Sequence, residues 1–109
     1  MIKKIFGQVG RLKNDKIEEY IELHADVWPK VLEMIRECNL QNYSIFIKED
    51  VVFAYFEYMG PDYETDIKRM ADDSITQQWW ALTKPCFTVY NELSDVNFYE
   101  DMKSIFHMA

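Results

Sequence analysis

The chain has 109 residues, of which 49% are hydrophobic and 16% aromatic, and its formal net charge at pH 7 is −7. This length and hydrophobic content predict a single domain over residues 1–109 with a hydrophobic core, and they exclude a disordered chain. The negative charge would repel phosphates, so we expect neither nucleic acid nor an anionic membrane surface as a partner. It favours a neutral or cationic small molecule instead.

No segment of the sequence has the character of a signal peptide or a membrane span. A helix needs about 20 apolar residues to cross a bilayer, and no run approaches that length, so we expect a cytoplasmic protein. In that setting Cys38 and Cys86 are expected to be buried thiols rather than a disulfide. Neither His24 nor His107 has Cys or Asp neighbours at the spacing of metal ligands, so no metal site is predicted.

The first predicted elements are a strand over residues 2–9 and a helix that begins near Asp15. Asp15 and Glu18, three residues apart, are a plausible capping box. Pro29 interrupts the helix, because proline lacks the N–H that would bond to the carbonyl four residues earlier, and it predicts a kink or a restart. The apolar stripe of this helix comprises Ile17, Tyr20, Ile21, His24, Val27, Trp28, Val31, Leu32 and Ile35.

The remaining pattern predicts a hairpin, two short helices and a last strand. The expected elements are strands at 42–48 and 51–58, helices at about 63–71 and 75–83, an irregular segment at 87–96 and a final strand at about 102–108. The order β-α-β-β-α-β is that of the split βαβ arrangement. We therefore predict an α+β, ferredoxin-like fold, with a four-stranded antiparallel sheet and helices on one face.

The strand predicted over residues 51–58 is apolar on both sides. Alternate side chains of a strand point to opposite faces of the sheet. On the two faces of this strand, Glu57 is the one residue that is neither apolar nor aromatic. Both faces of the sheet must therefore be covered, and the predicted helices suffice for one face only. A second copy of the chain is the natural cover for the other, so we predict a homodimer.

Tyr20, His24 and Trp28 are the candidates for function in the first helix. Their four-residue spacing places all three on the apolar face, where a group that titrates near neutral pH has no packing role. A histidine in such a position is more often a hydrogen-bonded structural residue than a catalyst. Tyr20 favours a catalytic role, because it adds a second proton-transfer group within reach of the same ligand atom.

Further candidates lie in the last predicted helix and at the start of the hairpin. Adjacent residues of a helix face different directions, so one of Trp79 and Trp80 is expected in the core and the other elsewhere. An indole stacks well on the C–H face of a sugar ring, although both residues would equally serve as anchors for a short helix. Asn42 and Tyr43 offer an amide and a hydroxyl to a ligand, or simply end the preceding loop.

These residues occur together, in the same order, in a known family. The chain resembles the L-rhamnose mutarotase family over nearly its whole length, and the combination of His-x-x-x-Trp-Pro with a later Trp-Trp is specific. The resemblance implies a dimeric α+β barrel of ferredoxin-like subunits and a cofactor-free enzyme that interconverts the α and β anomers of a 6-deoxy sugar. The residues that carry it are Tyr20, His24, Trp28, Pro29, Asn42, Tyr43, Phe53–Glu57, Gln78, Trp79, Trp80, Ile105 and Phe106.

The resemblance also implies roles for four of these residues. It places Tyr20 and His24 at the sugar and sets Trp79 and Trp80 beside it. Two departures from the family are Lys30-Val31, where the family has Glu-Leu, and a longer, less proline-rich segment over 91–101. The second departure leaves L-fucose open beside L-rhamnose. The same fold would also suit a cofactor-free monooxygenase or a non-catalytic binding domain, because a fold does not by itself specify a function.

Mutarotation suits a histidine and a phenol. The reaction needs a base for the proton of the anomeric hydroxyl and an acid for the ring oxygen, so that the ring opens and recloses on the other face. We expect His24 to transfer a proton, Tyr20 to donate or orient, and Trp79 or Trp80 to stack on the ring. Trp28, Asn42 and Tyr43 are expected to bind the same monosaccharide.

Overall fold

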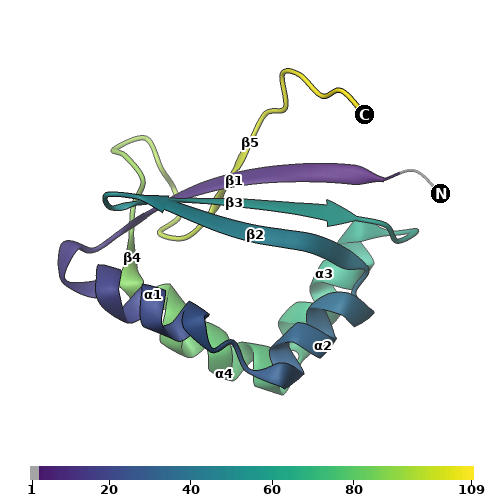
Figure 1. Ribbon diagram of the computed structural model, residues 1–109, viewed down its shortest axis with the longest axis horizontal. Coiled ribbons are helices and arrows are strands. Elements are labelled where there is room, and N and C mark those ends of the chain that lie inside the picture. The colour runs from purple at the N-terminus through teal and green to yellow at the C-terminus, as the bar shows by residue number, and fades with distance from the viewer. Residues whose placement is uncertain (1–2) are drawn as a thin grey trace.

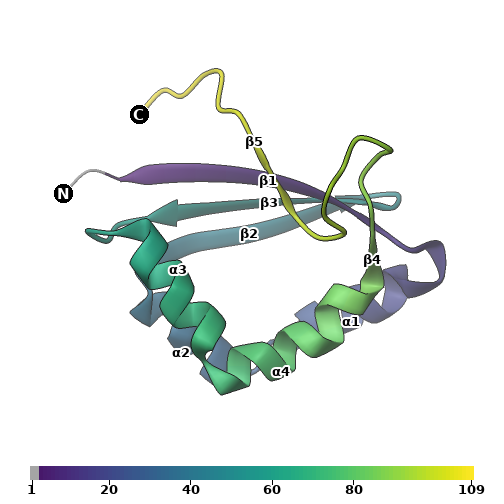
Figure 2. The same ribbon diagram turned by 180° about the vertical axis from the view of Figure 1, so that it is seen from behind.

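The computed structural model describes residues 3–109, which form one antiparallel sheet with all helices on one side (Figures 1 and 2). The sequence of elements contains the order β-α-β-β-α-β and confirms the predicted α+β class. Within the described residues the first strand begins at Lys4, and Ile2, where the predicted strand starts, lies outside them. The elements are β1 (Lys4–Leu12), η1 (Asn14–Lys16), α1 (Ile17–Ala25), α2 (Pro29–Glu37), β2 (Leu40–Lys48), β3 (Val51–Tyr58), α3 (Tyr63–Asp72), α4 (Ser74–Thr83), η2 (Lys84–Cys86), β4 (Phe87–Thr88) and β5 (Glu100–Met102).

The strand order is β2-β3-β1-β4, and β5 also pairs with β1. Both β4 and β5 are antiparallel to β1, β4 opposite Arg11–Leu12 and β5 opposite Gly7–Val9. The fourth strand of the sheet is thus split into two short pieces, with the segment 89–99 between them. The prediction of a final strand at 102–108 is wrong, because pairing ends at Met102 and residues 103–109 extend away from the sheet without helix or strand (Figure 1).

The long predicted helix is two helices. α1 ends at Ala25 and α2 starts with Pro29 in its first turn, where the missing proline N–H costs nothing. The restart that Pro29 predicted is confirmed. The capping box at Asp15 is wrong, because Asp15 lies in the 3₁₀ turn η1 and no side chain caps α1.

A bulge in β2 decides which side chains face the helices. The register between β2 and β3 shifts between Gln41 and Ser44, and Asn42 adopts a positive φ of 51°. Tyr43 consequently turns to the helix side of the sheet and stacks on Phe56, with the ring centroids 5.0 Å apart. Asn42 points to the opposite side, where its Nδ2 donates to Oε1 of Glu57 at 2.9 Å.

The core consists of two clusters of buried side chains between the sheet and the helices. One is built on Leu12, Tyr20, Val52, Cys86 and Phe87, and the other on Cys38, Leu40, Phe56, Tyr58 and Met70. Both cysteines are buried free thiols, as predicted.

A glycine in β1 makes room for the first cluster. A Cβ atom at Gly10 would lie 2.6 Å from Cε2 of Phe87, so only glycine lets that ring cross the strand.

The helices cover one face of the sheet, as predicted (Figure 1). Within residues 3–109 no helix covers the other face (Figure 2). Phe46, Phe53 and Met102 are exposed on this face. The helices of this described part are also too short and too polar to cross a membrane.

Candidate functional site

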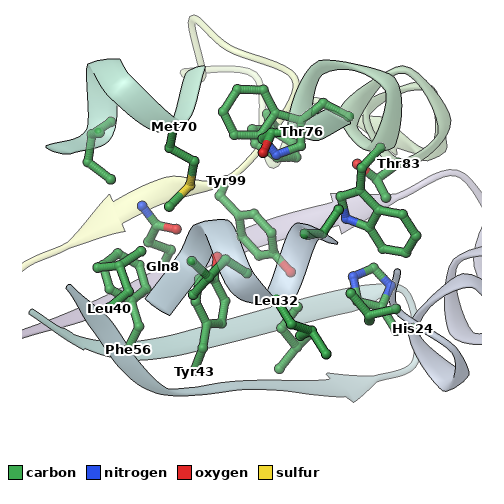
Figure 3. A pocket seen from close by; sticks show the side chains of 18 of the residues that line it. Gln8, His24, Leu32, Leu40, Tyr43, Phe56, Met70, Thr76, Thr83 and Tyr99 are labelled. Carbon is green, nitrogen blue, oxygen red and sulfur yellow. The ribbon is translucent and has the colours of Figure 1, made fainter. Parts of the chain in front are cut away.

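A cavity of about 480 Å³ lies between the helices and the sheet, and members of both core clusters line it (Figure 3). A volume of this size is typical of small-molecule sites in proteins. The lining consists of Gln8, Tyr20, His24, Val27, Val31, Leu32, Ile35, Leu40, Tyr43, Ile45, Phe56, Tyr63, Ile67, Met70, Thr76, Trp79, Trp80, Thr83, Phe98 and Tyr99.

His24 is in the last turn of α1 with its ring on the cavity. Its Nδ1 lies 2.9 Å from the backbone oxygen of Tyr20, one turn earlier. A carbonyl oxygen only accepts hydrogen bonds, so Nδ1 carries the proton and Nε2 keeps its lone pair. Burial also lowers the pKa of His24 from its ordinary 6.5. At neutral pH the side chain is therefore an uncharged imidazole, equipped to accept a proton at Nε2.

Tyr20 lies beside His24 and shares a hydrogen bond with a second tyrosine. The ring centroids of Tyr20 and His24 are 4.3 Å apart. The hydroxyl oxygens of Tyr20 and Tyr99 are 2.8 Å apart. Burial raises the pKa of both phenols well above the usual 10, so both stay protonated at neutral pH. The site thus holds a proton acceptor and two proton donors.

The three tryptophans have different positions relative to the cavity. Trp79 is buried, lines the cavity and places its ring 5.4 Å from that of His24. Trp80 also lines the cavity, and the ammonium of Lys84 lies 4.5 Å from its ring centroid. Trp28, which was predicted to touch the ligand, packs edge-on against Trp79 at 5.3 Å and is outside the lining. It supports the wall that Trp79 forms.

The two candidates in β2 lie on opposite faces of the sheet, and the bulge decides which of them faces the helices. Tyr43 lines the cavity, whereas Asn42 is held on the opposite face of the sheet by its bond to Glu57. This carboxylate also accepts from the hydroxyl of Tyr55 at 2.7 Å, and these hydrogen bonds lower the pKa of Glu57 to about 2. Asn42 therefore belongs to a polar cluster on the uncovered sheet face, away from the cavity where it was expected.

Gln8 and Tyr99 are polar residues of the lining that were missed in the sequence. Gln8 shares a strand face with Phe6 and Leu12, which both pack in the core, and a polar side chain on such a face is a signal that would have singled it out. Its Nε2 donates to Oδ1 of Asp101 at 2.8 Å. Tyr99 belongs to the segment 89–99, which has no periodic pattern. Its position depends on the pairing of β5 with β1, where Glu100 lies opposite Val9.

The cavity combines a polar part with an apolar part. His24, Tyr20 and Tyr99 come together at one part, and Leu40 and Met70 belong to another (Figure 3). Such a lining suits a small molecule with several hydroxyls and an apolar substituent. Within residues 3–109, no group of three or more His, Cys, Asp or Glu side chains is placed to hold a metal ion.

Comparisons with known proteins agree with one another. A family model described as L-rhamnose mutarotase matches residues 6–108. An L-rhamnose mutarotase of Shouchella clausii is 31% identical over 109 residues, which covers 100% of both chains. One of Bacillus subtilis is 33% identical over 96 residues, 86% of this chain and 88% of the relative.

A solved structure supports the fold. The crystal structure of an L-rhamnose mutarotase from Formosa agariphila matches with a TM-score of 0.75 over 97% of this chain and 99% of that chain. The two sequences are 20% identical, so this likeness is evidence for the architecture alone.

Proposed function

Because the chain belongs to the L-rhamnose mutarotase family, we propose that it interconverts the α and β anomers of L-rhamnose. As a member of this family it is an enzyme of the carbohydrate isomerase type. The observation that carries the proposal is the pair of rings 4.3 Å apart in the cavity, the His24 imidazole and the Tyr20 phenol. A base and an acid side by side match two neighbouring oxygens of one sugar.

The tautomer of His24 supports its role as the base. Nδ1 is tied to the carbonyl of Tyr20, so Nε2 accepts the proton of the anomeric hydroxyl. As this O–H bond breaks, the C1–O1 bond becomes a carbonyl and the bond from C1 to the ring oxygen breaks. The phenol of Tyr20 protonates the ring oxygen. The open aldehyde then rotates about C1–C2, and the steps in reverse close the ring on the other face.

The walls of the cavity support a 6-deoxy sugar as the ligand. Trp79 or Trp80 offers an indole face or N–H to the ring, and Tyr43 offers a hydroxyl. Leu40 and Met70 provide an apolar surface for the methyl group that replaces the C6 hydroxymethyl. L-fucose also has this methyl group, so it is the competing substrate to compare.

Exchange of the sugar anomers tests the function directly. NMR saturation transfer between the α and β resonances should show faster exchange with the protein than in buffer, and faster for L-rhamnose than for L-fucose. A panel of aldoses that carry a C6 hydroxymethyl group serves as the comparison. If L-rhamnose, L-fucose and the panel all exchange at the buffer rate, the chain is not a mutarotase.

We also propose that two copies pair through the sheet face opposite the helices. Phe46 on this face is 63% exposed, and Phe53 and Met102 are exposed beside the polar cluster around Glu57. The adjoining tail adds Ile105, which is 90% exposed. Exposed apolar surface of this extent, with hydrogen-bonding groups among it, is typical of a surface that a second protein covers.

Light scattering tests the pairing. At micromolar concentration the mass should be twice the 13.1 kDa of one chain. Phe46→Glu should shift the mass toward one chain, because it places a charge in the proposed interface. Leu82→Glu is the matched control, since Leu82 is an exposed apolar residue of α4 outside this face. A mass of about 13 kDa for the unchanged protein would refute the dimer.

A further inference from the structure

Tyr99 reaches the cavity from a part of the chain remote from the other reactive groups. It precedes β5, and Figure 3 shows its ring extending into the cavity with the hydroxyl at the inner end. That hydroxyl lies 2.8 Å from the hydroxyl of Tyr20, a residue 79 positions earlier in the chain. Strand pairing and helix packing thus bring together the two phenols and the imidazole of His24.

The two phenols have one proton more than their mutual hydrogen bond uses. Each carries one O–H, and the bond between them engages only one of the two. The second O–H is directed elsewhere, and both side chains line the cavity. One phenol can therefore donate its O–H to a ligand oxygen in the cavity while it accepts a hydrogen bond from the O–H of the other phenol.

The position of Tyr99 is well determined by its neighbours. Its ring packs edge-on against Phe87 at 5.1 Å and against Phe98 at 5.2 Å. The next residue, Glu100, is paired with Val9 in the sheet. These contacts hold the phenol before any ligand arrives, which is the condition for an effective proton donor.

We propose that Tyr99 is a catalytic residue, and that its hydroxyl, hydrogen-bonded to that of Tyr20, supplies the proton that the ring oxygen takes up during ring opening. This assignment rests on the function proposed above. It replaces the single phenol that acts as the acid in that reaction with a hydrogen-bonded pair of phenols. It gives a role to the segment 89–99, which splits the fourth strand of the sheet and brings Tyr99 to the cavity.

The proton transfers balance in the following way. Nε2 of His24 takes the proton of the anomeric hydroxyl, and the electron pair of that O–H bond forms the carbonyl. The electron pair of the bond between C1 and the ring oxygen goes to this oxygen, which takes the proton of Tyr99. Tyr20 passes its own proton toward the Tyr99 oxygen, so the negative charge is shared by the pair and faces the imidazolium of His24. Ring closure returns each proton.

Removal of single hydroxyls tests the pair. Tyr99→Phe and Tyr20→Phe each delete one oxygen and keep the ring, so packing is preserved. Each variant should lower kcat for anomer exchange by at least about 10-fold with little change in KM, since the lost O–H acts mainly as the ring opens. The double variant should be no slower than about the slower single variant, because the two hydroxyls act as one unit. Tyr90→Phe is the matched control in the same segment, where the ring faces Arg11 outside the cavity.

The outcomes separate this assignment from the function itself. If Tyr99→Phe retains the kcat of the unchanged enzyme, Tyr99 only packs and the assignment is wrong. If the losses of the two single variants multiply in the double variant, the hydroxyls act independently and there is no pair. If the unchanged protein does not accelerate exchange at all, the proposed function has failed before Tyr99 is at issue. Tryptophan fluorescence on adding L-rhamnose should show that Tyr99→Phe still binds the sugar.

Discussion

Replacement of His24 by alanine should lower the rate of anomer exchange by about 10²- to 10⁴-fold, the range that a positioned general base contributes. The effect is expected to be mainly on kcat, because Nε2 takes up a proton only as the sugar ring opens. NMR saturation transfer at saturating L-rhamnose measures it. His107→Ala is the matched control, since His107 is the other histidine and is exposed in the tail. Equal rates for His24→Ala and the unchanged enzyme would remove His24 from the mechanism.

The pH profile of the unchanged enzyme provides a second measure of the same group. Burial lowers the pKa of His24 below its ordinary 6.5, and only the neutral imidazole accepts a proton. kcat/KM should therefore be constant around neutral pH and fall as the pH drops through this lowered pKa. The residual rate of His24→Ala should lack this acidic decline. A decline centred above 6.5 would contradict the effect of burial.

Replacement of Phe87 by alanine should reduce the free energy of unfolding by about 3–5 kcal/mol, the usual cost of removing a buried aromatic ring. Phe87 is 1% exposed and packs edge-on against Tyr20 at 5.3 Å, Phe98 at 4.9 Å and Tyr99 at 5.1 Å. Loss of this ring leaves a cavity behind both phenols of the site. Urea unfolding followed by circular dichroism measures the change in stability.

A matched truncation at the surface provides the control. Leu93→Ala removes an apolar side chain that is 90% exposed in the segment between β4 and β5, and it should change stability by less than about 0.5 kcal/mol. Phe87→Ala should also slow anomer exchange under conditions where it remains folded, because Tyr20 and Tyr99 lose their common support. A loss below about 1 kcal/mol would show that Phe87 is not the centre of this cluster.

Much of the candidate site is local and was predictable. Residues four apart on a helix lie on one face whatever the rest of the fold does, so the spacing of Tyr20 and His24 placed their side chains together. The break at Pro29 was equally predictable, because the missing N–H is a property of the residue. Runs of apolar and β-branched residues in the hairpin predicted both strands, and the apolar character of both sides of residues 51–58 predicted a second apolar face of the sheet.

Two of the errors have a common physical origin. Asn42 and Tyr43 were expected at one site, but a bulge adds a residue to β2 and reverses which of the two faces the helices. The final strand was expected at 102–108 from its apolar residues, yet within one chain pairing with β1 ends at Met102. Register is set by the partner strand, so the pattern of a single strand does not contain it.

The sequence by itself determined the order of the elements, the helix face that carries Tyr20 and His24, and the restart at Pro29, because these follow from backbone geometry within a few residues. Only the tertiary structure decided that Tyr99 meets Tyr20 and that Trp28 lies outside the lining of the cavity. The assignment of the free lone pair of His24 to Nε2 also required the structure, since it depends on a hydrogen bond from Nδ1 to a carbonyl. Contacts between residues 79 positions apart arise from strand pairing and core packing, which no local pattern records.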